Sequence, residues 1–228
     1  LKMKLIGLIG GTSYHSTIVY YKLINELVGK EIGAQGNPPL LLYSLNIELM
    51  RSQDFEKINK TYLEIAQKLE KAGAKAIAIC ANTPHIVYDF VQPKIAIPIL
   101  HIAEATGREA KKIGLKKVGL LGNKPTMTKG FIPMYLKSAF KIETIIPAKQ
   151  YLEQAHHYVS DELTQGIFSV KAKSFFLNQM ELLKQRGAEG IILGCTELPL
   201  LLKDEDFDIP LLATTDLHAK MITEFILE

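Results

Sequence analysis

The chain has 228 residues, of which 47% are hydrophobic and 22% are charged, and its formal net charge is +3. This length can bury one large core or two small ones, and the composition is that of a globular protein. The small net charge, spread over interspersed lysines, arginines and acids, predicts neither a nucleic-acid partner nor a membrane-surface partner.

Short motifs exclude further classes of protein. The two cysteines show no metal-binding or disulfide spacing, there is no His-Glu-x-x-His, and no apolar run reaches the length of a membrane span. The first residues lack the basic and apolar segments of a signal peptide. We therefore expect a cytoplasmic protein without a metal site or membrane partner.

Strands and helices are expected to alternate along the first half. Apolar runs predict strands, and apolar residues at helical spacing predict helices. The expected order is a strand at 5–9, a helix whose apolar face holds Ile18, Tyr21, Ile24 and Leu27, a strand at 40–45, a helix at 54–72, strands at 76–80 and 95–100, and a helix at 102–112.

The second half follows the same scheme. Its expected elements are a strand at 117–122, a helix near 128–139, a strand at 143–146, a helical stretch at 150–186 broken near Gly166, strands at 190–194 and 209–212, and a helix at 216–226. Alternating strands and helices predict an α/β fold with parallel sheets, in which ligands bind beyond the carboxyl ends of the strands.

Three segments of the first half recur in the second half in the same order. Residues 6–10 match residues 118–122 at an offset of 112, 97–100 match 209–212 at the same offset, and 71–83 match 185–197 at an offset of 114. Matches at nearly one offset predict two similar halves. A ligand between the halves would meet two facing copies of each loop.

The second half places Cys195 directly after a buried strand. Its neighbours Gly194 and Thr196 belong to a loop that is expected to start a helical turn. A thiol at a helix N-terminus has a lowered pKa and forms thiolate more readily. The alternative is a buried structural cysteine, which is the usual state of this residue.

Polar residues also follow the other strands. Asn82 and Thr83 align with Thr196 and Glu197, and short polar side chains suit an amino-acid carboxylate or ammonium group; alternatively they only cap the next helix. The loop at 10–13, with Thr12 and Ser13, has the glycines of an anion-binding turn but not the spacing of a nucleotide-binding motif. The histidines show no ligand spacing: His85 and His101 are interpreted as local hydrogen-bonding residues, and the pair 156–157 as a solvated helix face.

The chain resembles the aspartate/glutamate racemase family, which inverts amino acids without pyridoxal phosphate. The resemblance covers nearly the whole sequence and depends on four segments: 6–17 (IGLIGGTSYHST), 82–85 (NTPH), 97–107 (IPILHIAEATG) and 190–197 (GIILGCTE). It implies two lobes, each a parallel four-stranded sheet flanked by helices, related by a pseudo-twofold axis with a cleft between them. The expected domains are lobe 1 at 1–100, lobe 2 at 101–215, and a C-terminal helix at 216–228 that packs back on lobe 1.

The resemblance also implies a homodimer, no cofactor, and two cysteines on opposite faces of the substrate Cα. This chain departs from that pattern, because the position of the first cysteine, directly before Asn-Thr, holds Ala81. Cys80 lies one residue too early, and on an extended backbone its side chain points to the other face. By position, the pocket would be lined by Thr12, Ser13, Gln53, Asn82, Thr83, Thr126, Lys173 and Thr196.

With Cys195 as the only catalytic cysteine, the second proton would come from Thr83, Cys80, a neighbouring histidine or water, and the reaction would be slow or one-directional. The leading interpretation is an amino-acid racemase for aspartate, glutamate or a related small amino acid. A one-cysteine, decarboxylase-like lyase and a non-catalytic protein that binds a small amino acid or dicarboxylate are the alternatives.

Overall fold

The computed structural model describes residues 2–34 and 36–228. The chain forms two compact units: unit 1 comprises the chain up to His101 together with His218–Glu228, and unit 2 is Ile102–Leu217. The chain therefore passes from one unit to the other twice, after His101 and after Leu217. Within the described residues, every helix is too short or too polar to cross a membrane.

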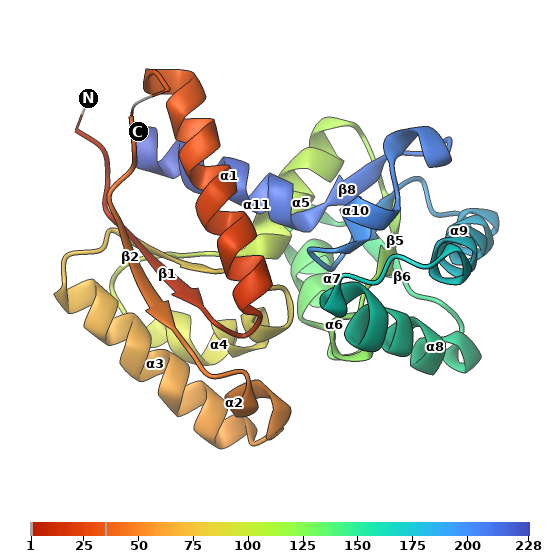
Figure 1. Cartoon of the computed structure of the whole chain (residues 1–228), viewed down its shortest axis with the longest axis horizontal. Helices are drawn as coiled ribbons and strands as arrows, with labels where there is room; N and C mark the ends of the chain where they lie inside the picture. Colours follow the sequence, from red (N-terminus) through yellow and green to blue (C-terminus); the bar gives the residue numbers. More distant parts are fainter. Residues whose placement is uncertain (1, 35) are drawn as a thin grey trace. The chain divides into compact units, whose positions relative to one another are not determined.

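Unit 1 contains a parallel four-stranded sheet with the strand order β2-β1-β3-β4 (Figure 1). Its elements are β1 (Ile6–Gly10), α1 (Tyr14–Ile32), β2 (Leu40–Ser44), α2 (Glu48–Arg51), α3 (Phe55–Lys71), β3 (Ala76–Ile79), a 3₁₀ turn (Thr83–Val87), α4 (Tyr88–Val91), a second 3₁₀ turn (Gln92–Lys94) and β4 (Ile99–Leu100).

Helices cover both faces of this sheet because successive side chains of each strand point to opposite sides. Ile77 and Ile79 of β3 pack with the buried face of α3. Ala76, Ala78 and Cys80 point the other way, into a cluster with α1 and with α11 (Thr214–Leu227), whose last residues belong to unit 1. The continuously apolar strand is thus buried on both faces.

Unit 2 repeats this arrangement, with a parallel sheet in the order β6-β5-β7-β8. Its elements are α5 (Ile102–Lys112), β5 (Lys117–Leu121), α6 (Lys124–Thr128), α7 (Phe131–Tyr135), a π-helical turn (Leu136–Phe140), β6 (Glu143–Ile145), a 3₁₀ turn (Lys149–Tyr151), α8 (Leu152–His157), a π-helical turn (Tyr158–Glu162), a 3₁₀ turn (Leu163–Gln165), α9 (Val170–Gln185), β7 (Ile191–Leu193), α10 (Leu198–Leu201), a 3₁₀ turn (Asp204–Asp206) and β8 (Leu211–Ala213).

The predicted fold class, two parallel four-stranded sheets flanked by helices, is confirmed. A glycine in each central strand shows how closely the halves repeat each other. A Cβ on Gly7 would lie 3.0 Å from Leu69 Cβ and 3.0 Å from Ile77 Cδ1. A Cβ on Gly119 would lie 2.9 Å from Leu183 Cδ1 and 2.7 Å from Ile191 Cδ1. Each glycine therefore lets the leucine of the covering helix approach the sheet.

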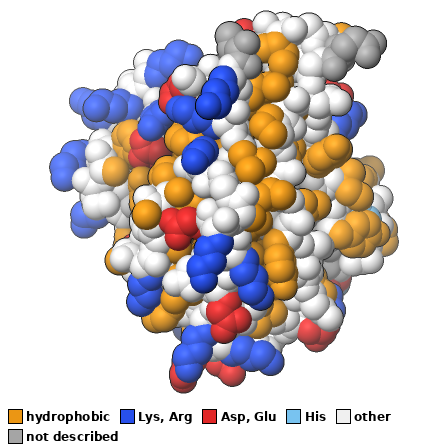
Figure 2. Space-filling model, turned by 90° about the vertical axis from the view of Figure 1, so that its left-hand side faces the viewer, with side chains coloured by type: hydrophobic (Ala, Val, Ile, Leu, Met, Phe, Trp, Pro, Cys, Tyr) orange, Lys and Arg blue, Asp and Glu red, His pale blue; other side chains and the backbone are white. Residues whose placement is uncertain are grey.

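The predicted apolar face of α1 is wrong in part. Ile18 and Tyr21 are 59% and 54% exposed, whereas the buried face contains Thr17, Tyr20, Ile24 and Val28. This face is rotated because Thr17 bonds the loop before the helix, with its Oγ1 accepting a hydrogen bond from Gly11 N at 2.9 Å. Figure 2 shows hydrophobic side chains exposed among charged ones on the left-hand side of the molecule as it is drawn in Figure 1.

Two predicted elements are shorter than expected. The strand expected at 95–100 is β4, Ile99–Leu100. The residues before it do not join the sheet, since the Ala96 and Ile97 backbone N–H groups donate to Oε1 of Glu70. The helix expected near 128–139 is split into α6, α7 and a π-helical turn, because Gly130 has a φ of 80° and interrupts the first helix.

Candidate active site

The loop after β1 is built around Gly11, whose φ is 89°. A Cβ at this position would lie 2.0 Å from the carbonyl oxygen of Leu45, so only glycine fits there. The next residue, Thr12, is half-buried, and its Oγ1 lies 2.9 Å from Oη of Tyr62 on α3. The Thr12 side chain is thereby held at the carboxyl end of the first sheet.

Ser13 caps α1, and its Oγ accepts a hydrogen bond from Ser16 N at 3.3 Å. Ser16 Oγ in turn donates to the carbonyl oxygen of Cys80 at 2.7 Å. These bonds join the loop after β1 to the end of β3. The structure therefore brings Thr12 and Ser13 together with the segment that begins at Ala81.

Ala81 and Thr83 are half-buried, whereas Asn82 between them is only 6% exposed. Asn82 Oδ1 has no hydrogen-bond partner among residues 2–34 and 36–228. A buried amide oxygen without a partner is costly, which makes it a candidate acceptor for a ligand ammonium group or an ordered water.

Cys80 belongs to the core. It is 1% exposed and packs with α1 and α11, so its side chain points to the face that the extended backbone predicts. Burial raises the pKa of the Cys80 thiol far above its ordinary value. A thiol that is buried and protonated in the core is a poor candidate for the second acid.

Three buried histidines form a cluster in unit 1. The ring of His85 lies 4.7 Å from that of His101 and 5.4 Å from that of His218, between ring centroids. His85 is expected to form local hydrogen bonds. In the described residues neither ring nitrogen has a partner of good hydrogen-bond geometry, and the backbone of Ile79 contacts the ring closely enough to oppose the lowering of its pKa. Burial lowers the pKa of all three, to about 3 for His101 and about 4 for His218, so the rings are neutral.

Gln53 lies at the end of α2 in a left-handed conformation, with a φ of 54°. Its side chain is exposed, and Nε2 donates to the carbonyl oxygen of Met50 at 2.9 Å. The structure thus folds the Gln53 side chain back on its own helix. A non-glycine residue in this region of φ is uncommon and consistent with a constrained position.

In unit 2, Cys195 follows β7 and is half-buried. Its Sγ donates a hydrogen bond to Oε2 of Glu197 at 2.8 Å. Burial and the Glu197 carboxylate raise the pKa of the thiol well above its ordinary value. The backbone N–H groups of Glu197 and Leu198 lower this pKa, but their effect is smaller. The expected lowering of the pKa is therefore wrong: α10 is four residues long, and a carboxylate stands beside the sulfur.

The loop around Cys195 packs against the loop after β5. A Cβ at Gly194 would lie 2.8 Å from the carbonyl oxygen of Leu121 and 3.1 Å from Cγ2 of Thr126. The residue before Cys195 must therefore be small. Thr126 is fully buried, so it packs under the loop rather than facing solvent. Thr196, the residue after Cys195, is half-buried.

Lys173 lies in the first turn of α9, and its Nζ is 2.8 Å from Oδ1 of Asp206. The structure pairs this candidate ligand of a substrate carboxylate with an acid of its own unit.

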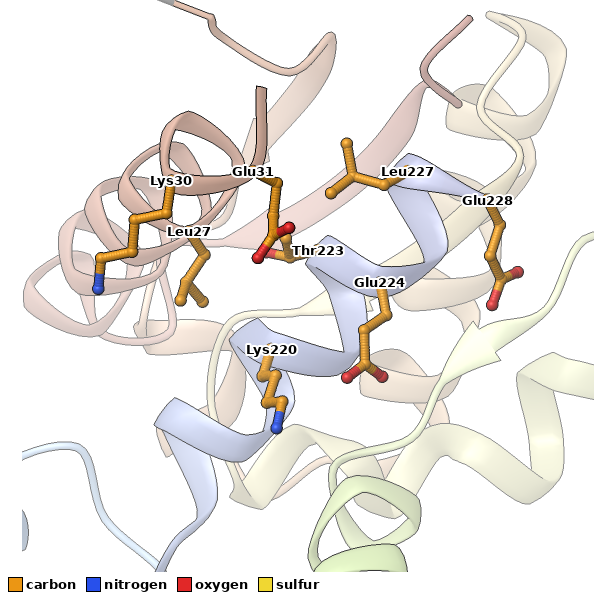
Figure 3. A pocket seen from close by; sticks show the side chains of 8 residues that line it. All are labelled: Leu27, Lys30, Glu31, Lys220, Thr223, Glu224, Leu227 and Glu228. Carbon is orange, nitrogen blue, oxygen red and sulfur yellow. The ribbon is translucent and has the colours of Figure 1, made fainter. Parts of the chain in front are cut away.

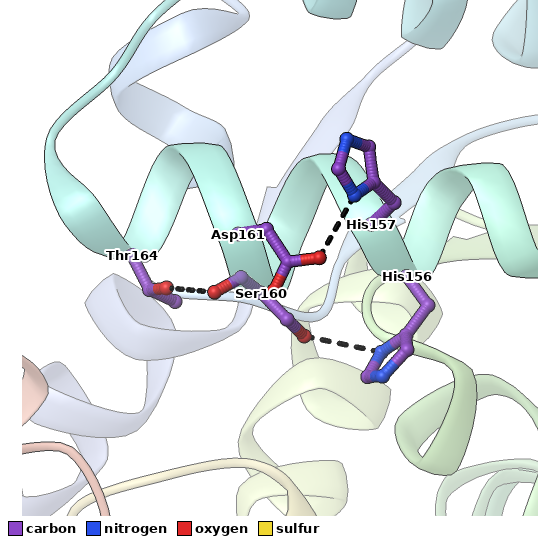
Figure 4. Close-up of polar contacts among 5 residues, drawn as sticks. All are labelled: His156, His157, Ser160, Asp161 and Thr164. Atoms are coloured by element: carbon purple, nitrogen blue, oxygen red, sulfur yellow. Dashed lines mark hydrogen bonds and ion pairs between the residues drawn. The ribbon is translucent and has the colours of Figure 1, made fainter.

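Two other features lie apart from these loops. The predicted solvated pair is His156 and His157. His157 is exposed, and its Nδ1 lies 2.8 Å from Asp161 Oδ2; His156 is half-buried, and its Nδ1 lies 3.1 Å from Ser160 Oγ (Figure 4).

A groove of about 610 Å³ lies between the C-terminal turns of α1 and α11, away from the carboxyl end of the first sheet (Figure 3). Its lining residues are Leu27, Lys30, Glu31, Lys220, Thr223, Glu224, Leu227 and Glu228.

Sequence reasoning missed three residues that the structure connects to the candidates. Glu197 contacts the Cys195 sulfur, His218 completes the histidine cluster, and Asp206 holds Lys173. Only Glu197 had a signal in the sequence, as an acid two residues after the cysteine within Gly-Cys-Thr-Glu. The other two are brought together by long-range packing.

Comparison with known families decides the relationship. The model of the Asp/Glu/Hydantoin racemase family matches residues 9–222. The chain belongs to this family. The Cys195 and Ala81 loops are thus parts of a racemase-family fold, and the racemase-family resemblance drawn from the sequence is confirmed.

Individual relatives of this racemase-family chain agree. The broad specificity amino-acid racemase RacX of Bacillus subtilis (strain 168) is 28% identical over 221 residues, which are 95% of each chain. An Asp/Glu racemase candidate from Yersinia pestis superposes with a TM-score of 0.93 at 35% identity, covering 99% of this chain and 100% of the other. An aspartate racemase homologue from Pyrococcus horikoshii OT3 gives a TM-score of 0.88 at 36% identity, with coverage of 99% and 100%.

Proposed function

We propose that this protein is an amino-acid racemase that works by proton transfer alone, with Cys195 as the group that exchanges the α-proton. The observation that carries the proposal is the pair formed by the half-buried Cys195 thiol and the Glu197 carboxylate, 2.8 Å from sulfur to oxygen, at the carboxyl end of β7. A cysteine with a base beside it can cycle between thiol and thiolate during turnover.

In this mechanism Glu197 first accepts the thiol proton, and the thiolate then removes the proton from the substrate Cα. The electron pair of the broken C–H bond stays on the substrate as a carbanion, which hydrogen bonds to the α-carboxylate stabilise. Return of a proton to the opposite face of Cα inverts the centre. Because the raised pKa keeps Cys195 protonated at neutral pH, this cysteine is also well suited to donate a proton to a carbanion.

Unit 1 has polar groups of its own that suit an amino acid. Thr12, Ser13, Asn82 and Thr83 lie at the carboxyl end of its sheet, and the unpartnered Asn82 Oδ1 suits a substrate ammonium group. Ala81 cannot carry a proton, so a second proton donor would be Thr83 or water, and the second step would be slower than the first.

The names of the relatives point to different substrates, since one is an aspartate racemase homologue and another is a broad specificity racemase. The test therefore incubates each enantiomer of aspartate, glutamate, alanine and leucine with the protein in heavy water. NMR follows the α-hydrogen, and chiral chromatography follows the enantiomers. Inversion with incorporation of deuterium supports the proposal, and Cys195→Ala is expected to abolish both while the fold is kept.

Other results would favour the alternatives that Ala81 leaves open. Exchange of the α-hydrogen without inversion indicates a one-base site, and release of carbon dioxide from a malonate-like acid indicates a lyase. Thermal stabilisation by these acids without any exchange indicates a binding protein. The expected homodimer is tested separately, by light scattering of the purified protein; a monomer contradicts it.

A further inference from the structure

The groove between the C-terminal turns of α1 and α11 lies apart from the loops that hold Thr12 and Asn82 (Figure 3). The backbone N–H of Lys4, just before β1, donates to the carbonyl oxygen of Ile226 at 2.9 Å, so α11 ends at the amino edge of the first sheet. Thr12 and Asn82 follow strands and lie at the opposite, carboxyl edge. Every residue that lines the groove belongs to unit 1, and its volume of about 610 Å³ is that of a site for a small organic ligand.

The side chain of Thr223 is a buried polar group of this groove. It is 5% exposed, and its Oγ1 has no hydrogen-bond partner in the part of the chain that the structure describes. Figure 3 shows it pointing from α11 into the space between the two helices. A buried hydroxyl without a partner is costly, and a ligand that bonds to it removes this cost.

Charged side chains of both signs line the α11 wall on either side of Thr223. Lys220 and Glu224 are one helical turn apart, yet among the residues whose placement the structure gives they form no ion pair. Lys22 and Glu26, at the same spacing on α1, do pair, at 3.7 Å. The charges of the groove are therefore available to a ligand.

The α1 wall has the same combination of charges. Lys30 and Glu31 line it and have no ion-pair partner within residues 2–34 and 36–228. Half-buried Leu27 and Leu227 add an apolar side chain on each wall. A ligand with a single charge would be repelled by one pair of these residues, whereas a zwitterion with an aliphatic side chain is attracted by all of them.

The spacing of the charges indicates the length of the zwitterion. Four residues of α11 separate Lys220 from Glu224, a rise of about 6 Å. The ends of an extended dipeptide are about 7 Å apart, and those of a single amino acid about half as far. Thr223 lies between the two charged positions, where a dipeptide has its peptide bond.

We propose that this groove is a binding site for a short aliphatic peptide with free ends, of dipeptide length. Its carboxylate would bind Lys220 and Lys30, its ammonium group Glu224 and Glu31, and its peptide group the Thr223 hydroxyl. The proposal goes beyond the racemase function and does not depend on it.

Isothermal titration calorimetry of the whole protein tests the assignment with alanyl-leucine as the probe. N-acetyl-alanyl-leucine lacks the ammonium group and alanyl-leucine amide lacks the carboxylate, so each should bind about fivefold more weakly, the effect of one exposed ion pair. Free leucine is too short to reach both charges and Thr223, and should not displace the dipeptide.

Two variants locate the binding. Thr223→Val keeps the shape but removes the hydroxyl, and should weaken binding of alanyl-leucine about tenfold. The same change should not lower the thermal unfolding temperature of the free protein, because the hydroxyl it removes is unpartnered. Lys220→Gln should weaken binding of alanyl-leucine about fivefold and leave that of the amide unchanged.

Glu26→Gln is the matched control, since Glu26 is an exposed acid of α1 that pairs with Lys22 outside the groove. It should leave the affinity for alanyl-leucine unchanged. Absence of binding, equal affinity for the free and the capped peptides, or displacement of the dipeptide by free leucine would each overturn the proposal. So would wild-type affinity in both Thr223→Val and Lys220→Gln, because the dipeptide would then bind elsewhere.

Discussion

His218 Nε2 lies 2.6 Å from the carbonyl oxygen of Leu100, although 118 positions separate the two residues. Since a carbonyl only accepts, Nε2 carries the proton, and Nδ1 is left to accept from Tyr20 Oη at 2.8 Å. Leu100 and His218 flank the two points at which the chain passes between the units. Through these two bonds the neutral ring holds the chain segments at Leu100 and His218 to α1 in the core of unit 1.

Acid should destabilise unit 1 through its histidine cluster. The pKa values of about 4 for His218 and about 3 for His101 lie below the unfolded value of 6.5, and that of His85 is lowered too. Between the folded and unfolded pKa values, the unfolded chain therefore binds protons on these histidines that the folded chain does not bind. Stability is complete above about pH 6.5 and falls as the pH drops toward the folded values, by up to about 1.4 kcal/mol per pH unit for each ring.

Chemical denaturation between about pH 7 and about pH 5.5 measures this loss before most carboxylates titrate. The exposed His157, replaced by Gln, gives the control, and the variant should keep the wild-type slope. An unfolding free energy that is the same at both ends of this range would contradict the prediction.

Glu197→Gln should separate the reactivity of Cys195 from its turnover. Without the carboxylate, one cause of the raised thiol pKa disappears, so alkylation by iodoacetamide should reach half its maximal rate at a lower pH. Turnover should nevertheless fall by about a hundredfold, because the base that accepts the thiol proton is gone. Mass spectrometry can follow Cys195 alone, since Cys80 is buried.

The matched control for this variant is Glu205→Gln, an exposed acid of the loop after α10. It should leave both the alkylation profile and the turnover as they are in the wild-type protein. If Glu197→Gln turned over substrate at the wild-type rate, the carboxylate would have no part in proton transfer.

Ala81→Cys should increase racemisation. Position 81 is the repeat partner of Cys195 at an offset of 114, it is half-buried, and it directly precedes Asn82. A thiol there adds an acid–base group where the chain now has a methyl group, and an increase of about tenfold or more in the rate of inversion is expected. Chiral chromatography of the product measures it.

Ala81→Ser tests whether the gain needs sulfur, because a hydroxyl is a far weaker acid than a thiol. This variant should show little or no gain. If Ala81→Cys folds normally but inverts its substrate no faster than the wild type, the site has been adapted to another reaction.

The order of the elements could be predicted because each strand is a short apolar run followed by glycine or polar residues. Three matched segments also predicted that the two halves are alike, and both sheets have the same strand order. Which face of α1 is buried could not be predicted from the apolar pattern. Hydrophobicity favours Ile18 and Tyr21, whereas Ser16 and Thr17 are buried because their hydroxyls bond to neighbouring backbone.

In the candidate site, too, local sequence patterns predict some features, whereas others depend on contacts between distant residues. The position of Cys195 at a strand end follows from the sequence, but the direction of its pKa depends on burial and on where the Glu197 side chain points. The neutralisation of Lys173 depends on a loop residue 33 positions away, Asp206. Local patterns place the chemical groups, and long-range packing sets their charge.

Two glycine-to-alanine changes should shift stability in opposite directions. Gly107 lies within α5, and a Cβ there would be 2.3 Å from the ring of Phe140, so Gly107→Ala should cost about 1–3 kcal/mol through the displaced ring. Gly29 lies within α1, where the nearest atom to a new Cβ is the Cα of Ala34, at 3.7 Å. Gly29→Ala should therefore stabilise the protein by about 0.5–1 kcal/mol, since alanine favours the helix. Urea unfolding of both variants measures the difference, and a Gly107→Ala protein as stable as the wild type would mean that Phe140 moves aside freely.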